Sequence, residues 1–299
     1  MSLGTWGLSG DAYGPVDERD AENVIARAAD IGFSLFDTAD AYGGGRMELL
    51  LAKTLAAHPG ASIVTKGGTD RTCEPARKRF DPEFIKASVR RSLKRLGRDR
   101  IDLYLLHNPS ASAIAVGEAT EVVKDLVKQG LIRHWGVSAG DADVARAAIR
   151  QGAEVLELAY NLFHSADLHR LAGEIMVSKT GVLARSTLSY GLLAGLWGNE
   201  QEFHDGDHRQ QRWTKLELER RLQQLEAVRF LVRGDVLTMR ASAVRFVLAN
   251  QLVSSAVLGP RTVEQLEQLV REVGAGPLYL PDDDLSQLPR ALDRVGIST

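Results

Sequence analysis

The chain has 299 residues, of which 44% are hydrophobic and 25% are charged, a composition typical of one large α/β domain or two smaller ones. The formal net charge of -2 offers no electrostatic surface to a polyanion, so we expect neither nucleic acid nor an anionic membrane as a partner. The single cysteine, Cys73, excludes an internal disulfide and is consistent with a reducing compartment. Because the sequence has neither a signal-peptide pattern nor an uncharged apolar stretch of about 18 residues, we expect a cytoplasmic protein.

Short apolar segments with strand-forming residues recur at roughly the thirty-residue length of one strand-helix unit. The expected strands are 3–7, 33–37, 62–66, 101–107, 132–137, 155–159 and 182–184, followed by a delayed eighth at 255–258. Eight such units favour a closed (β/α)8 barrel, the TIM barrel. A doubly wound open sheet is the alternative, but it would normally place GxGxxG after an early strand, and the glycines at 43–45 do not fit that spacing.

Helical patterns and their start and stop signals lie between these strands. Asp81 and Pro82, for example, are an N-cap followed by proline at the first helical position. The expected helices are 18–31, 46–57, 82–96, 113–129, 141–151, 166–178, 215–232, one beginning near 262, and 282–294. We expect a single domain over 1–299, with an insertion at about 198–235 that comprises a polar loop, 199–212, and a charged, solvated helix.

Ionisable side chains stand at the ends of three successive predicted strands. Asp37, Lys66 and His107 occupy these ends, and Tyr42 lies in the glycine-rich loop after Asp37. In parallel α/β barrels such strand ends meet where active sites are assembled. An ammonium beside a phenol lowers its pKa from about 10, so Lys66, fixed by Asp37, would tune Tyr42. Each residue alone also has an ordinary structural explanation, but the four together suit proton donation to a carbonyl oxygen while hydride reaches the carbon.

Motifs along nearly the whole chain, in order, resemble the aldo-keto reductases. The motifs are Gly4-Thr5-Trp6, the block from Phe36 to Glu48, Thr65-Lys66, Leu106-His107-Asn108, Gly136-Val137-Ser138, Tyr160-Asn161, the segment from Ser186 to Gly195, and the segment from Gly259 to Leu266. The resemblance implies a (β/α)8 barrel that reduces an aldehyde or ketone with NADPH. It makes Tyr42 the general acid, Lys66 and Asp37 its tuning pair, and His107 the residue that orients the carbonyl.

The same resemblance implies a set of cofactor-binding positions. They are Gly4, Thr5, Trp6, Ser138, Glu157, Arg185, Ser186, Leu188, Gly191, Leu193, Gly195, Gly259, Arg261 and Gln265. Arg261 would face the 2′-phosphate, which favours NADPH (NADP+) over NADH because a guanidinium matches phosphate with a fork of hydrogen bonds.

Several positions depart from the family pattern. Ala139 and Glu157 replace an asparagine and a glutamine that hold the nicotinamide carboxamide, and a carboxylate cannot donate to its carbonyl. The negative charge of Glu157 leads us to expect that oxidised cofactor binds relatively more tightly here. Arg185 replaces an aromatic that stacks on nicotinamide, Leu196 a lysine near the phosphates, and Leu269 an adenine-binding asparagine.

Two functions therefore stay open. The first is carbonyl reduction, and the second is a non-catalytic, nicotinamide-binding regulatory or sensor barrel. The substrate is expected to be a small carbonyl compound in a relatively open site, and the assembly a monomer or a small homo-oligomer. The 67–80 loop is basic, with Arg71, Arg77, Lys78 and Arg79; an acidic substrate would explain this, but we expect a solvated loop.

Overall fold

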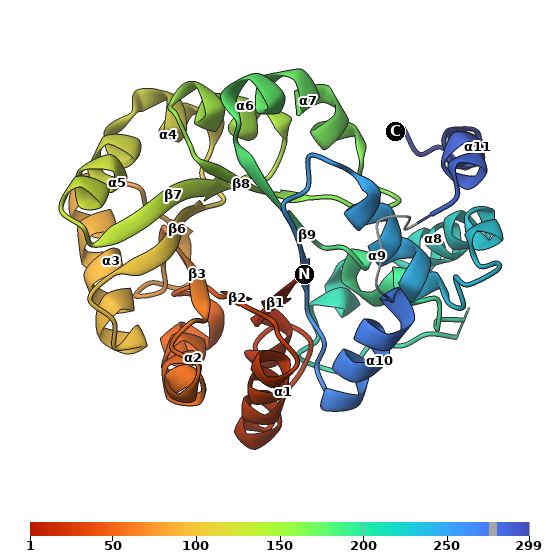
Figure 1. The fold of residues 1–299 in the computed structure, drawn as a ribbon, viewed down its shortest axis with the longest axis horizontal. Coiled ribbons are helices and arrows are strands. Elements are labelled where there is room, and N and C mark those ends of the chain that lie inside the picture. The colour runs from red at the N-terminus through yellow and green to blue at the C-terminus, as the bar shows by residue number, and fades with distance from the viewer. Residues whose placement is uncertain (199, 275–279, 299) are drawn as a thin grey trace.

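Eight parallel strands form a closed barrel with helices around it (Figure 1). The structure is a computed structural model that describes residues 1–198, 200–274 and 280–298. The barrel strands are β1 (Ser2–Gly4), β2 (Leu35–Asp37), β3 (Ser62–Gly67), β6 (Ile101–His107), β7 (Ile132–Ser138), β8 (Val155–Ala159), β9 (Gly181–Arg185) and β10 (Ser255–Leu258). β1 closes the barrel, pairing through Leu3 with Leu258 on one side and Phe36 on the other. The predicted (β/α)8 barrel is confirmed.

The helices pack around the outside of the barrel. They are α1 (Glu18–Asp30), α2 (Arg46–Thr54), α3 (Pro82–Leu96), α4 (Ala111–Val116), α5 (Glu118–Lys128), α6 (Ala142–Arg150), α7 (Ala166–Ser178), α8 (Lys215–Ala227), α9 (Met239–Ala249), α10 (Val263–Val273) and α11 (Asp282–Asp293). Asp81 caps α3 as predicted, with its side chain accepting a hydrogen bond from the Phe84 backbone N–H. Most of the expected helices agree with these bounds.

Several elements differ from the sequence prediction. The helix expected over 113–129 is two helices, because Gly117 between them has φ 89°, which ends the first helix. The first strand stops at Gly4, and residues 6–8 form a 3-10 turn instead. Helix α9 was not predicted, because its residues from Met239 to Val247 are all buried, Arg240 and Arg245 included, so no exposed polar face alternates with a buried apolar one.

Two hydrophobic cores hold the barrel together. A small cluster of Val64, Leu103, Leu105, Leu183 and Val257 fills the barrel interior, and a larger cluster lies between the strands and the surrounding helices. Successive strand residues point alternately inward and outward. The strands therefore contribute side chains to both cores.

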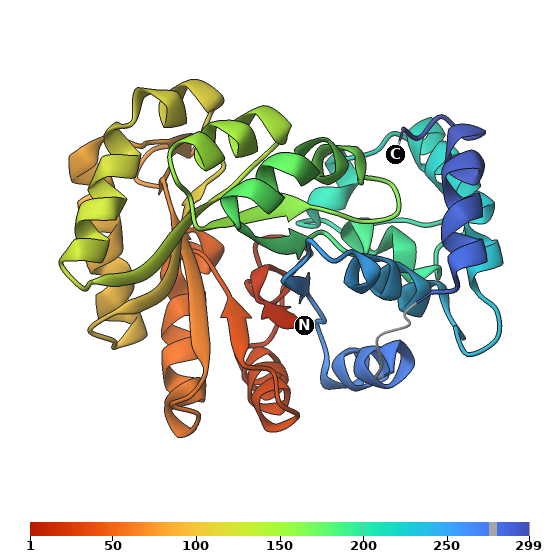
Figure 2. The ribbon, with the colours of Figure 1, turned by 45° about the horizontal axis from the view of Figure 1, so that its top comes forward.

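The insertion returns to the barrel mouth. Its charged helix is shorter than predicted: α8 ends at Ala227, and α8, α9 and α11 lie on one side of the barrel (Figure 2). The backbone N–H of His208 donates to Ala12 O at 2.8 Å, and Asp207 forms a bridge with Tyr13. The loop before α8 is thus attached to the loop after β1, and Asn199, its predicted start, lies outside the described residues.

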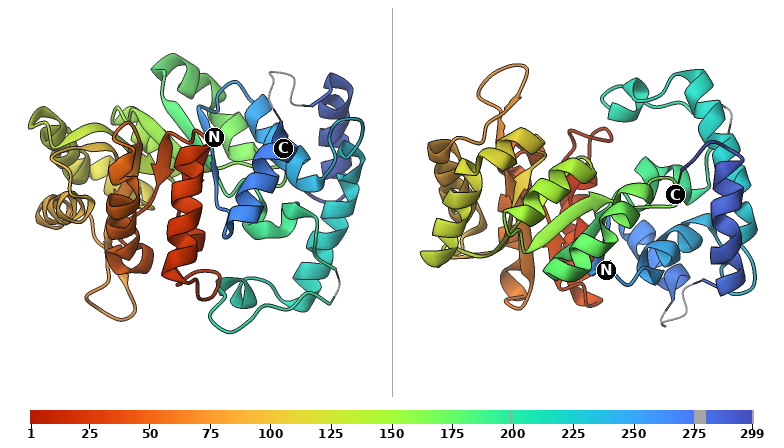
Figure 3. Two further views of the ribbon diagram at one scale, coloured as in Figure 1. Left: turned by 60° about the horizontal axis from the view of Figure 1, so that its bottom comes forward. Right: turned by 90° about the horizontal axis from the view of Figure 1, so that it is seen from above.

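A hairpin that was not predicted extends from the same end of the barrel. It consists of β4 (Thr69–Asp70) and β5 (Arg77–Lys78), which pair antiparallel just after β3. Both views of Figure 3 show the hairpin region and the 200–212 segment projecting to the same side. The hairpin and the insertion therefore flank one barrel mouth. No helix in the described part of the chain is long and apolar enough to cross a bilayer.

Candidate active site

Ionisable side chains line the barrel mouth because each follows an interior apolar residue by two positions. Alternation along the strands puts both members of such a pair on the inner face. The pairs are Leu35 and Asp37 on β2, Val64 and Lys66 on β3, Leu105 and His107 on β6, Val155 and Glu157 on β8, and Leu183 and Arg185 on β9. The side chains of Asp37, Lys66, His107, Glu157 and Arg185, at the C-terminal ends of five strands, thus point toward one space.

Lys66 and Asp37 form a buried ion pair at this mouth. The Lys66 side chain is 1% exposed, and its Nζ donates to Asp37 Oδ1 at 2.6 Å and to Thr38 O at 3.1 Å. Burial alone would lower the pKa of Lys66, but the carboxylates of Asp37 and Glu157 outweigh burial and raise it. Burial raises the pKa of Asp37, while Lys66 opposes that shift. Lys66 is therefore an ammonium held in one place.

Tyr42 lies between this ammonium and His107. A 3-10 turn over Tyr42–Gly45, with Gly43 and Gly44 at positive φ, places the ring 5.4 Å from Lys66 Nζ. The Tyr42 and His107 ring centroids are 6.0 Å apart in an edge-on arrangement. Burial raises the pKa of Tyr42, and Lys66 acts in the expected lowering direction without overcoming burial. Tyr42 is therefore protonated, as a proton donor must be.

His107 is a neutral imidazole in this structure. Burial, followed by the positive charges of Lys78, Lys66 and Arg185, holds its pKa well below the ordinary value. Its Nδ1 has no hydrogen-bond partner among the described residues. A neutral imidazole has one N–H donor, which suits hydrogen bonding to a carbonyl oxygen.

Glu157 and Arg185 add opposite charges to the same pocket. Glu157 Oε2 lies 3.4 Å from Lys66 Nζ and has no hydrogen-bond partner among the described residues. Arg185 Nη2 donates to Ala139 O at 3.1 Å, and Nη1 reaches Ser186 Oγ at 3.4 Å. The three departures from the family pattern at 139, 157 and 185 are therefore neighbours of the cluster of predicted catalytic residues and of one another. Because Lys66 is close, the charge of Glu157 is partly compensated.

The segment after β9 presents an unusually shaped backbone. Ser186, Ser189 and Tyr190 have φ values of 56°, 45° and 61°, a region that non-glycine residues uncommonly occupy. Asn161 Nδ2 donates to Ser186 O at 2.8 Å and supports the start of the segment. At Gly195, φ is 76° and an added Cβ would lie 2.7 Å from Met239 Cβ. This backbone is the stretch in which a cofactor was expected, including Leu188, Gly191 and Leu193.

The N-terminus of α10 offers donors to an anion. Gln265 Oε1 accepts from the Arg261 backbone N–H at 2.9 Å, and the Thr262 side chain caps the helix. The Arg261 guanidinium donates to Gly14 O and Pro15 O at 3.2 Å, and its Nε has no partner among the described residues. A helix N-terminus and a guanidinium with a spare donor together fit a phosphate group.

The remaining cofactor-binding positions, and two departures from the family pattern, lie in different surroundings. Gly4, Thr5, Trp6, Ser138 and Gly259 lie at the ends of β1, β7 and β10, next to the cluster. Leu269, by contrast, is buried in the hydrophobic core, and Leu196 is exposed. The Trp6 ring lies 6.4 Å from the Tyr42 ring and 5.0 Å from the His208 ring of the insertion. The insertion therefore places His208 beside Trp6 at the mouth, and the expected openness of the site stays a prediction.

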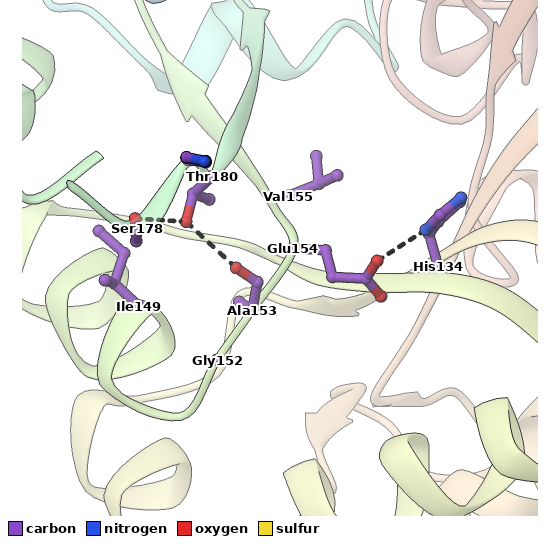
Figure 4. Close-up of a pocket in the computed structure, with 9 residues that line it drawn as sticks. His134, Ile149, Gly152, Ala153, Glu154, Val155, Ser178 and Thr180 are labelled. Carbon is purple, nitrogen blue, oxygen red and sulfur yellow. Dashed lines mark hydrogen bonds and ion pairs between the residues drawn. The ribbon is translucent and has the colours of Figure 1, made fainter. Parts of the chain in front are cut away.

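A separate cavity of about 480 Å³ lies at the opposite end of the barrel (Figure 4). His134 Nδ1 and Glu154 Oε2 are 2.7 Å apart there, and Ser178 Oγ and Thr180 Oγ1 are also 2.7 Å apart. These polar groups bond one another, and the cavity is at the strand starts rather than the strand ends. In the described ranges, no group of three His, Cys, Asp or Glu side chains is placed to hold a metal ion.

Comparison with known proteins agrees with this architecture. The sequence profile of the Aldo/keto reductase family matches residues 1–292. The chain belongs to the aldo/keto reductase family. Members of the family are oxidoreductases that use nicotinamide cofactors, and carbonyl reduction by such a cofactor is the chemistry that the membership supports.

Three relatives show the breadth of the family around this chain. Aldo-keto reductase YhdN of Bacillus subtilis is 31% identical over 284 residues, covering 92% of this chain and 85% of the relative. The NADH-specific methylglyoxal reductase of Escherichia coli is 30% identical over 215 residues, 65% of each chain. The solved structure of a glycerol dehydrogenase from Gluconobacter oxydans is 27% identical, has a TM-score of 0.84, and covers 99% of this chain and 91% of that one.

Proposed function

We propose that this protein reduces an aldehyde or ketone to an alcohol, with Tyr42 as the general acid and NADPH as the hydride donor. The observation that carries the proposal is the meeting of a protonated phenol, a buried ammonium and a neutral imidazole at the strand ends. A nicotinamide cofactor, when bound, supplies hydride to the carbonyl carbon.

The side chains divide the remaining work. His107 donates a hydrogen bond that orients the carbonyl oxygen. Tyr42 gives its proton to that oxygen as negative charge develops there. Lys66 then stabilises the phenolate that Tyr42 becomes, since its Nζ lies 5.4 Å from the ring centroid. Asp37 holds Lys66 in position and balances its charge.

NADPH rather than NADH is proposed because of Arg261. Its guanidinium lies beside the N-terminus of α10, where the 2′-phosphate would add two negative charges that NADH lacks. One relative is named as NADH-specific, so the preference has to be measured in this protein. The cytoplasmic location and the monomeric or small homo-oligomeric state remain predictions.

The altered nicotinamide contacts favour one alternative, a non-catalytic barrel that binds the cofactor as a sensor or regulator. Glu157 and Arg185 together bring two charges to the place where a neutral carboxamide was expected to bind. The alternative predicts cofactor binding without turnover.

Turnover across a panel of aldehydes, with NADPH and NADH in parallel, distinguishes the two functions. We expect NADPH oxidation that depends on aldehyde and is faster than NADH oxidation. Cofactor binding without oxidation for any aldehyde would contradict the reductase and support the sensor.

A further inference from the structure

Three of the four basic side chains in the 67–80 loop are already paired with carboxylates. Arg71 Nη1 lies 3.0 Å from Asp11, and Arg77 Nε lies 3.8 Å from Asp70. Arg79 bridges Asp70 at 3.2 Å and Asp81 at 3.0 Å. These three arginine side chains are 38–66% exposed, which agrees with the expected solvated loop, and their charges are balanced within it.

Lys78 differs from the other three. Its Nζ donates to Thr69 Oγ1 at 2.9 Å and to His107 O at 2.8 Å, both of which are uncharged oxygens. Among the residues that the structure describes, no carboxylate lies within ion-pair distance of it. Burial lowers the pKa of Lys78, and the more distant Asp40 opposes that shift. The Lys78 residue is exposed as a whole, and its ammonium has hydrogen-bond partners but no compensating negative charge among the described residues.

The hairpin register explains why Lys78 turns toward the site. Thr69 pairs with Lys78 and Asp70 pairs with Arg77, and side chains of directly paired residues lie on the same face of a sheet. The Thr69 and Lys78 face contacts the end of β6, where His107 stands. Arg77, on the other face, reaches Asp70.

The charge of Lys78 acts on the catalytic imidazole. It is the first of the positive charges that depress the pKa of His107, ahead of Lys66 and Arg185. Lys66 is balanced by two carboxylates, but Lys78 is not. The mouth beside His107 therefore carries a positive charge that a bound anion would neutralise.

We propose that the substrate is a carbonyl compound with an anionic group, a carboxylate or a phosphate, and that Lys78 binds this group while His107 holds the carbonyl oxygen. The inference rests on the proposed carbonyl reduction. Lys78 would exchange its hydrogen bond to a neutral oxygen for one to the anion. An anion adds Coulomb attraction between opposite charges to the hydrogen bond, which a neutral oxygen does not offer.

Matched pairs of aldehydes test the proposal. 4-Carboxybenzaldehyde is compared with 4-formylbenzamide, its uncharged isostere, and glyceraldehyde 3-phosphate with glyceraldehyde. The readout is the ratio of kcat/KM within each pair, with kcat and KM reported separately. If the ratio is well above one only in the first pair, the anionic group of the substrate is a carboxylate. If it is well above one only in the second pair, the group is a phosphate.

We expect the wild-type ratio to be about tenfold, which corresponds to about 1.4 kcal/mol. Lys78→Gln should bring the ratio to about one, mainly by raising KM for the anion, and Lys78→Arg should restore part of it. Arg77→Gln is the matched control: it removes the same charge from the same hairpin and should keep the ratio. A wild-type ratio near one in both pairs, or an equal loss in Lys78→Gln and Arg77→Gln, would overturn the proposal.

A calorimetric titration separates failure of this proposal from failure of the reductase assignment. If no aldehyde is turned over, the reductase assignment fails, and 4-carboxybenzaldehyde and glyceraldehyde 3-phosphate are titrated directly into the protein and its variants. Binding of either that is lost in Lys78→Gln and kept in Arg77→Gln supports the anion site. Absence of binding, or binding unaffected by Lys78→Gln, overturns it.

Discussion

Lys66 is a buried ammonium shared between Asp37 and Glu157. Asp37 makes the closer contact, at 2.6 Å, and Glu157 lies 3.4 Å away. Removing a charge from a buried pair leaves its partner uncompensated, which is costly. Because Asp37 remains beside Lys66 when Glu157 is neutralised, Lys66 stays paired. The charge of Glu157 can therefore be removed without dismantling the site.

Changing Glu157 to glutamine tests the effect of its charge on the cofactor. At about 5 Å and an effective dielectric of about 20, one unit charge on another is worth about 3 kcal/mol before desolvation. Lys66 compensates part of this, so we expect Glu157→Gln to lower the affinity for NADP+ relative to NADPH by about fivefold to tenfold. The ratio of the two dissociation constants, measured by calorimetry, is the readout.

Glu154→Gln serves as the control, because Glu154 precedes the same strand but lies at the opposite end of the barrel. Its affinity ratio should match the wild type. If the ratio of the NADP+ and NADPH dissociation constants is unchanged in Glu157→Gln, the charge of Glu157 does not favour oxidised cofactor.

The sequence predicted which four side chains meet at the strand ends, but not their protonation. Reactive side chains at successive strand ends are readable from strand periodicity, which is why Asp37, Lys66 and His107 were identified. The net pKa of Tyr42 depends on how deeply the ring is buried, and the sequence does not specify this. Lys78 was visible only as one of four basic residues, because its partners depend on the register of a hairpin that was not predicted.

At the scale of elements, helix α10 and the residue before its cap form the proposed phosphate site. Arg261 is held by Gly14 and Pro15 of the loop after β1, so one guanidinium connects the first and last strand-helix units. The sequence supplied this element because Thr262 is a typical N-cap. The sequence did not predict α9, because a helix that is buried on every side has no periodic pattern. It also did not predict the break at Gly117.

Arg261→Ala should weaken NADPH binding selectively. A charge-assisted, forked contact with phosphate is worth about 1.5–3 kcal/mol, so we expect the NADPH dissociation constant to rise by about tenfold to a hundredfold. NADH lacks the 2′-phosphate, and its affinity should change little.

Fluorescence titration with both cofactors measures this selectivity. Arg271→Ala, in the last turn of the same helix and exposed, is the matched control and should leave both affinities unchanged. Equal weakening of NADPH and NADH in Arg261→Ala would mean that the arginine contacts another part of the cofactor.

At the scale of the whole molecule, the three-residue strand β1 closes the barrel. β1 pairs with β10 and β2, so the first residues and the last strand of the barrel are held together. The repeat of strand-helix units predicted that the barrel is closed. It did not predict that the insertion contacts the loop after β1 at the site. Asp207 of the insertion pairs with Tyr13, nearly two hundred residues earlier in the sequence. Because of this pairing, the His208 ring lies against the Trp6 ring at the mouth.

Leu3→Ala tests the role of β1 in closing the barrel. Leu3 is fully buried, and truncating such a leucine costs about 2–5 kcal/mol. We expect the free energy of unfolding to fall by about that amount, measured by urea denaturation with fluorescence and circular dichroism. Leu237→Ala, at a side chain that is 72% exposed, should change it by less than about 0.5 kcal/mol. Equal stabilities of the two variants would show that β1 contributes little to the fold.

The most direct test of carbonyl reduction at this site is the turnover of Tyr42→Phe with NADPH and an aldehyde that the wild type accepts. The substitution removes the proposed proton donor and keeps the ring between Trp6 and His107. We predict that kcat falls by at least about a hundredfold while NADPH affinity stays within about twofold. Tyr13→Phe, which removes a hydroxyl elsewhere at the mouth, should retain most of the turnover. A Tyr42→Phe variant with wild-type turnover would contradict the proposed function of Tyr42.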